Sequence, residues 1–137
     1  MATYTKILQF TKDLIDGVHD FDAHAFKVAL SNVVVNTNAT LSAITQITGT
    51  GYTAGGSSTT VTTSTASGTA KAVMTDVTWT AGGTWGSLRY PVLYNDTPTS
   101  PADPTIAFWD YGSSIALASG ETFTWDADPT NGIFTLA

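Results

Sequence analysis

The sequence contains no cysteine, so neither a disulfide bond nor a thiolate metal site can form within it. Charged residues make up only 12% of the chain, about half the share that is usual for globular domains. No apolar run approaches the roughly 18 residues that a membrane-spanning helix needs. Residues 1–4 also lack the basic segment and apolar run that begin a signal peptide. We therefore expect synthesis in a cytoplasm and no membrane partner.

Basic residues are few and unevenly placed. Residues 1–75 hold four bases and four acids, which cancel, whereas residues 76–137 hold Arg89 alone against seven acids and account for the whole net charge of −6. Binding to nucleic acid phosphates requires clustered Lys and Arg. The charge distribution therefore argues against a nucleic-acid partner, and it favours solvent or a basic partner for the C-terminal half.

Threonine is the most informative residue that is present, with 26 copies among 137 residues. Its branched Cβ is stiff and suits a half-buried pleated surface, so the composition favours strands. Hydrophobic residues are 42% of the chain and aromatic residues 11%, which is enough for a substantial core. The length and composition predict one nearly all-β domain.

Alternation of apolar and polar residues begins at residues 26–30, and turn signals such as Asp128–Gly132 separate the later segments. Pro91 lies inside one predicted strand, and its missing N–H indicates an edge strand or a bulge. About eight short strands predict a jelly-roll barrel or β-sandwich over residues 23–137. The expected strands lie at 26–30, at 59–66 and 69–80 on either side of Ser67–Gly68, and at 88–94, 105–111, 115–117, 122–125 and 133–136.

Some segments leave alternatives open. Residues 41–47 have threefold apolar spacing that fits a strand or one helical turn. Val73, Val77 and Trp79 are expected to share one face of their ribbon. Residues 5–18 have helical spacing but also suit a strand pair, so residues 1–22 are predicted to form a separate N-terminal helix or arm.

The one cluster of metal-ligand residue types contains His19, Asp20, Asp22 and His24. A metal site needs ligands that converge on one point, and in a strand the two histidines would face opposite sides. A solvated turn explains the cluster more simply. These four residues are therefore only weak metal candidates, and we predict neither a metal nor a cofactor.

No pattern indicates catalysis. There is no G-x-S-x-G motif, and Glu121 is the single glutamate, so neither a nucleophile elbow nor a clear acid pair is present. The glycines at 49–51 and 82–83 lack the Lys and the following helix of a phosphate loop and are expected to be turns. We predict that the protein is not an enzyme.

The aromatic residues allow two interpretations. Four tryptophans and several tyrosines could form a sugar-stacking platform, as in a carbohydrate-binding module, or they could pack in the core and at interfaces. The residues concerned are Trp79, Trp85, Trp109, Trp125, Tyr90, Tyr94 and Tyr111. Three of the four tryptophans lie in predicted strands, which favours packing.

The order of several segments resembles that of small virion proteins of tailed bacteriophages, and in particular head decoration (cement) proteins. The segments are Phe26-Lys-Val-Ala-Leu-Ser-Asn32, Ala43-Ile-Thr-Gln-Ile47, Gly51-Tyr-Thr-Ala-Gly-Gly56, Arg89-Tyr-Pro-Val-Leu-Tyr-Asn95, Ala107-Phe-Trp-Asp-Tyr-Gly112 and Gly120-Glu-Thr-Phe123. The resemblance implies a jelly-roll-like subunit, commonly a homotrimer, made in the host bacterial cytoplasm. It would sit on the capsid exterior and stabilise the capsid by binding the major capsid protein.

Large apolar residues are the candidate contacts of such a protein, with aromatic side chains as anchors. The candidates are Tyr4, Ile7, Phe10, Leu14, Phe21, Trp85 and Tyr94, most of them in the predicted arm at residues 1–22. A tail or fibre component that contacts a host receptor is the main alternative. A carbohydrate-binding module is the second alternative.

Overall fold

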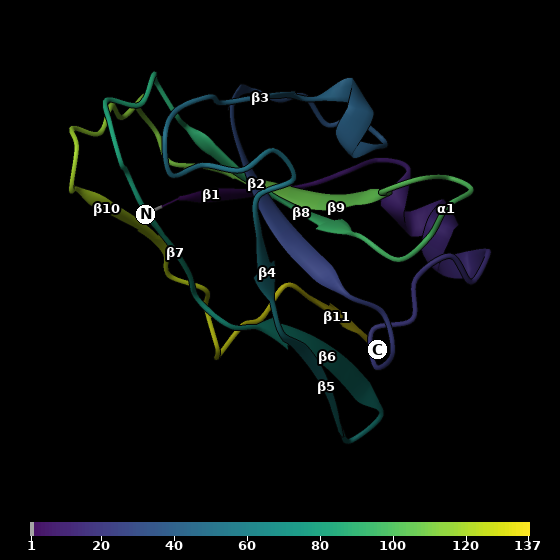
Figure 1. Ribbon diagram of the computed structural model, residues 1–137. Helices are drawn as coiled ribbons and strands as arrows, with labels where there is room; N and C mark the ends of the chain where they lie inside the picture. Colours follow the sequence, from purple (N-terminus) through teal and green to yellow (C-terminus); the bar gives the residue numbers. More distant parts are fainter. Residues whose placement is uncertain (1) are drawn as a thin grey trace.

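The computed structural model describes residues 2–137, and these residues are mostly β, with 43% in strands and 7% in helices. The all-β prediction is confirmed, and the arrangement of several antiparallel sheets is consistent with a sandwich (Figure 1). The described elements are, in chain order, β1 (Thr3–Lys6), α1 (Phe10–Ile15), β2 (Phe26–Val33), the 3₁₀ turn η1 (Leu41–Ala43), β3 (Thr45–Gln46), β4 (Ser57–Thr59), β5 (Val61–Ala66), β6 (Thr69–Met74), β7 (Val77–Thr80), β8 (Tyr90–Asn95), β9 (Thr105–Asp110), β10 (Thr122–Trp125) and β11 (Phe134–Leu136).

The largest sheet has the strand order β1-β9-β8-β2-β3, and β4 pairs with β2 on the edge that β3 also uses. Strand β9 lies between β1 and β8, and its first five residues are all buried. The strand predicted at residues 105–111 is therefore present as Thr105–Asp110, and it is an interior strand of the sheet. Continuous burial is expected for a strand that is covered on both faces.

Two smaller sheets pack against the large one. Strands β7 and β10 form a pair, and β5, β6 and β11 form a three-stranded sheet. One hydrophobic cluster takes in buried residues of all three sheets, and a smaller cluster of Ala29, Leu41 and Tyr94 lies apart from it. Since consecutive residues of β2 enter different clusters, this strand is covered on both faces rather than half-buried.

Pro91 occupies an interior strand, so the edge-strand alternative is wrong. The pairing of this strand with β9 does shift register, as the bulge alternative requires, but between Leu93 and Tyr94 rather than at Pro91. The amide of Asp96 donates to the carbonyl of Ala25, and hydrogen-bonded pairs recur at every second position of an antiparallel ladder. Pro91 therefore stands opposite Leu30 in a pair that exchanges no hydrogen bonds, and its nitrogen faces β9. The assigned ladder to β9 starts only at Val92, so the missing N–H interrupts no assigned pair.

The ribbon at residues 59–80, predicted as two strands, contains β5, β6, β7 and the last residue of β4. The turn at Ser67–Gly68 is confirmed, but a second break at residues 75–76 separates β6 from β7. In β6 the buried residues are Ala72 and Met74, so Val73 faces the other side and does not share the core face with Trp79. The break at residues 75–76 shifts which residues face the core, so the alternation in β7 cannot be extended back into β6.

The N-terminal segment contains both of the elements that its sequence suggested. Strand β1 pairs with β9, and the short helix α1 follows. Ile7 and Phe10 are 0% and 2% exposed and belong to the main core cluster. Residues 3–15 are thus built into the same core as the rest of the chain, which corrects the prediction of a separate arm ending at residue 22.

Neither helix in the described residues is long and apolar enough to cross a membrane.

Replacing Phe10 tests whether this segment is part of the core. Its ring packs against Phe134 of β11 at 5.3 Å and against Phe21 at 6.2 Å between centroids. Phe10→Ala should lower the free energy of unfolding by about 3–5 kcal/mol, because it leaves a cavity in a packed core. Ile15→Ala in the same helix is the matched control, since Ile15 is 82% exposed, and it should change stability by less than about 0.5 kcal/mol. Urea unfolding measures both, and equal effects would mean that the segment is not part of the core.

Candidate functional site

A groove of about 800 Å³ lies beside β1 on the described surface. This volume lies within the size range of small-molecule binding sites. Its walls come from the start of the chain, the end of β9, β10 and the segment that leads into β11. Its lining includes Ala2, Tyr4, Trp109, Tyr111, Trp125, Asp126, Asp128, Asn131, Gly132 and Phe134. Together they define what we call the aromatic groove.

Aromatic side chains from three strands form the floor of the aromatic groove. Tyr4 of β1 stands opposite Trp109 of β9, and their rings meet edge to face at 5.8 Å between centroids. Trp109 in turn contacts Trp125 of β10 at 4.8 Å. Both tryptophans are less than 10% exposed, whereas Tyr4 is 39% exposed and Tyr111 48% exposed. The tyrosines are therefore the aromatic surface that a partner can reach.

One wall of the aromatic groove is a turn that Asp128 organises. Its carboxylate accepts hydrogen bonds from the backbone amides of Thr130 and Asn131, and these bonds lower the pKa of Asp128. Gly132 closes the turn with φ +74°, and a Cβ at this position would lie 2.3 Å from the carbonyl oxygen of Ala72. A glycine is required here because the turn packs directly on the backbone of β6.

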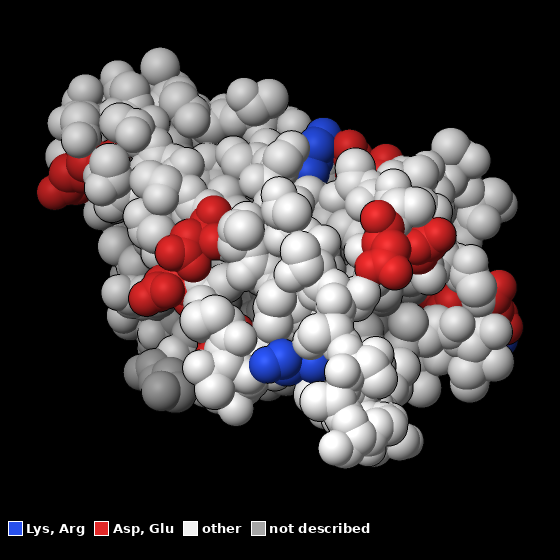
Figure 2. All heavy atoms as spheres, turned by 90° about the horizontal axis from the view of Figure 1, so that it is seen from below, with Lys and Arg blue, Asp and Glu red and all other residues white. Residues whose placement is uncertain are grey.

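Negative charge surrounds this turn. Asp126 is exposed and forms no hydrogen bond or ion pair with the rest of the described chain, whereas Asp76 accepts the amide of Ala127. Lys71 is the nearby base, and its Nζ donates to the carbonyl of Thr130. Figure 2 views the molecule from below, and acidic side chains outnumber basic ones on the face that it shows.

Asp110 does not add to this charge, because Arg89 neutralises it. The guanidinium donates to both carboxylate oxygens, at 2.7 and 2.9 Å. This contact, together with the amide of Gly112, holds the pKa of Asp110 below its usual value. Arg89 is the one base of residues 76–137, so no free cation of that half reaches the aromatic groove.

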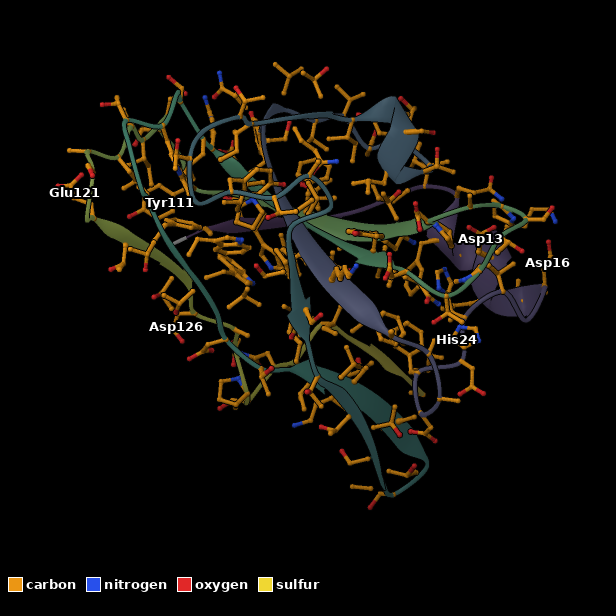
Figure 3. All side chains as sticks on the ribbon, in the orientation of Figure 1. Asp13, Asp16, His24, Tyr111, Glu121 and Asp126 are labelled. Carbon is orange, nitrogen blue, oxygen red and sulfur yellow. The ribbon has the colours of Figure 1, made fainter. Side chains whose placement is uncertain are left out.

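His24, one of the four weak metal candidates, lies far from this groove, as the labels of His24 and Asp126 in Figure 3 show. Asp20 accepts the amides of Asp22 and Ala23 in a tight turn, and Asp22 accepts the hydroxyl of Thr63. No group of three or more His, Asp or Glu residues in the described chain could hold a metal ion.

The two histidines instead share one amide group. The side-chain nitrogen of Asn95 lies 3.1 Å from Nδ1 of His19 and 2.8 Å from Nδ1 of His24, while its oxygen accepts the amide of Thr97. An NH₂ group only donates, so both Nδ1 atoms must be acceptors and both neutral rings carry their proton on Nε2. Asn95 thereby ties the N-terminal segment to β8.

His19 is buried among aromatic rings. Its ring lies 5.3 Å from that of Phe10 and 5.8 Å from that of Phe21, and it is only 9% exposed. Its Nε2 and the Oδ2 of Asp13 are buried without a hydrogen-bond partner among the described residues. Burial lowers the pKa of His19 to about 4, although the charge of Asp13 acts in the opposite direction.

Most of the predicted interface residues are not on the surface. Ile7, Phe10, Trp85 and Tyr94 are at most 2% exposed and pack in the core, so the structure corrects their assignment as contact residues. Leu14 and Phe21 are half-buried against the core. Only Tyr4 lies in the aromatic groove. The sequence did not predict that residues 126–132 contribute to the aromatic groove, because their composition indicates only a turn.

Comparison of the chain with protein-family models, with curated proteins and with solved structures found no match.

The pKa of His19 predicts how stability depends on pH. The unfolded chain takes up a proton near pH 6.5, whereas the folded chain takes it up only near pH 4. The folded state should therefore lose stability as pH falls from 6.5 towards 4, by about 1–2 kcal/mol at pH 5. Urea unfolding at pH 5 to 7 measures this change. His19→Gln removes the titrating ring, so an equally steep dependence in this variant would refute the assignment.

Proposed function

We propose that this protein is a non-catalytic structural protein that binds other protein subunits, and more specifically that it decorates and stabilises the capsid of a tailed phage by binding the major capsid protein. The observation that carries the binding role is the aromatic groove, which presents two partly exposed tyrosines beside a sheet edge. Exposed aromatic side chains over a packed floor are typical of protein interfaces.

The capsid role rests on the sequence resemblance described above. An all-β subunit supports it, since the resemblance implies that fold class. A decoration protein acts in many copies, so a modest contact at each copy is sufficient. A homotrimer on the capsid exterior is part of the proposal.

The tail or fibre role is the rival within the same class, and nothing in the fold favours one over the other. The carbohydrate-binding role has less support. All four tryptophans are at most 9% exposed, so they cannot form the open stacking platform that this role would require. Packing in the core accounts for them.

Location on the particle tests the proposal directly. In purified virions of the phage that encodes the chain, quantitative mass spectrometry should find it in numbers comparable to the major capsid protein, and cryo-electron microscopy should place it on the head. Particles from a deletion mutant should release their DNA at a lower temperature, and addition of the purified chain should restore the wild-type temperature. A few copies at the tail would support the rival role, and absence from the particle would refute both.

A further inference from the structure

We infer that the outer edge of β1 receives an extended segment of the partner protein as an additional antiparallel strand, with an apolar side chain in the aromatic groove and a Lys or Arg beside Asp126. The inference rests on the proposed function for the identity of the partner as a protein subunit. It adds the mode of binding and the chemistry of the segment that is recognised.

The main chain of β1 has unused hydrogen-bonding groups on its outer side. The amide of Ile7 donates to the carbonyl of Ile106 at 3.0 Å, and the ladder continues in register to Thr3 opposite Asp110. Since hydrogen-bonded pairs alternate, Thr3 and Thr5 direct their backbone groups to β9. Tyr4 and Lys6 therefore direct theirs away from the sheet.

This edge is open along its length. Among the described strands β1 pairs with β9 alone, and no hydrogen bond of the described chain uses the amides of Tyr4 or Lys6. Thr3, Tyr4 and Lys6 are exposed. An added strand forms hydrogen bonds with the backbone groups of every second residue on the edge, and the outward backbone groups of Tyr4 and Lys6 have this spacing. Unpaired edges of this kind are templates for strand addition.

The register decides which side chain of the added strand enters the aromatic groove. A residue opposite Tyr4 projects from the same face of the sheet as Tyr4, roughly 5 Å away, as paired residues do. That face carries Trp109 and Trp125. An aromatic or large aliphatic residue at this position would cover the exposed part of the Tyr4 ring and fill the groove.

The charged residues near each end of β1 indicate which side chains the added strand should carry on either side of the position opposite Tyr4. Towards Ala2 the added strand approaches the wall formed by residues 124–128, where Asp126 has no partner among the described residues. Asp128 and Asp76 add negative charge, and Lys71 offsets part of it. A Lys or Arg is favoured there. At the other end, Lys6 favours an acidic or neutral residue directly opposite.

A defined peptide tests this recognition. The probe is fluorescein-labelled Glu-Thr-Trp-Thr-Lys, in which antiparallel pairing sets Glu opposite Lys6, Trp opposite Tyr4 and Lys opposite Ala2. Its control is Lys-Thr-Trp-Thr-Glu, which has the same composition and reversed charges. Fluorescence anisotropy with the full chain should show saturable binding of the probe, and weaker binding of the control. Equal binding of the two peptides, or no saturable binding up to about 1 mM, would overturn the inference.

Two pairs of variants locate the contact. Lys6→Pro removes an outward amide and leaves the ladder to β9 intact, whereas Lys6→Thr removes only the charged side chain. The proline variant should bind the probe about tenfold more weakly than the threonine variant, the effect of losing a main-chain hydrogen bond. Asp126→Asn should weaken binding about twofold to fivefold, and Asp16→Asn at the opposite end of the molecule should not (Figure 3).

If Lys6→Pro does not fold, a second probe tests the same contact. This probe is the same peptide with N-methyl groups on the amides that face β1. It should not bind the wild-type chain, and undiminished binding would refute strand addition. Pairing of β1 with β1 of a second copy is the other possible occupant. A wild-type dimer that Lys6→Pro makes monomeric in sedimentation would show that the edge serves self-association, which also refutes the inference.

Failure of this inference is distinguishable from failure of the proposed function. If Lys6→Pro chains still occupy capsids as Lys6→Thr chains do, the protein is a decoration protein that uses another surface. If the probe binds as expected but the chain is absent from virions, the recognition mode stands and the capsid role is wrong.

Discussion

The contact between the indole rings of Trp109 and Trp125 joins the large sheet to the β7–β10 pair, with 4.8 Å between the ring centroids. Trp109 belongs to β9, the strand that also holds β1 in register. The position of Tyr4 therefore depends on the same strand that anchors the second layer. Because both indoles are buried, this contact fixes the floor of the aromatic groove and leaves the tyrosines at its rim accessible.

The two ends of the molecule differ in how they are packed. At one end, Phe10, His19 and Asn95 tie the N-terminal segment to the core, and this arrangement requires a neutral imidazole. At the other end, the aromatic groove provides apolar surface, the outer edge of β1 provides backbone groups without a partner among the described residues, and Asp126, likewise without such a partner, provides negative charge. The first end is closed by packing and the second is open, so recognition of a partner is proposed at the second.

Local chemistry made much of the fold predictable. Alternation identified β2 and β10, the glycine after Ser67 marked the turn between β5 and β6, and the Asp128–Gly132 turn led correctly into β11. The errors occurred where partners decide the outcome. Pro91 is tolerated in an interior strand because its nitrogen avoids the β2 ladder, and the sequence does not contain that register. The candidate site was the least predictable part, since only Tyr4 of the proposed contact residues lies in it.

By itself, the sequence determined the β-rich class, the scarcity of positive charge after residue 75 and several of the turns, such as those at Ser67–Gly68 and Asp128–Gly132, because these depend on composition and on neighbouring residues. Tertiary structure alone decided which strand edge stays unpaired and which apolar residues stay exposed. Ile7 and Tyr4 are three positions apart, yet one is fully buried and the other lines a groove. Their environments are set by strands about a hundred residues later in the chain, and no local pattern records that pairing.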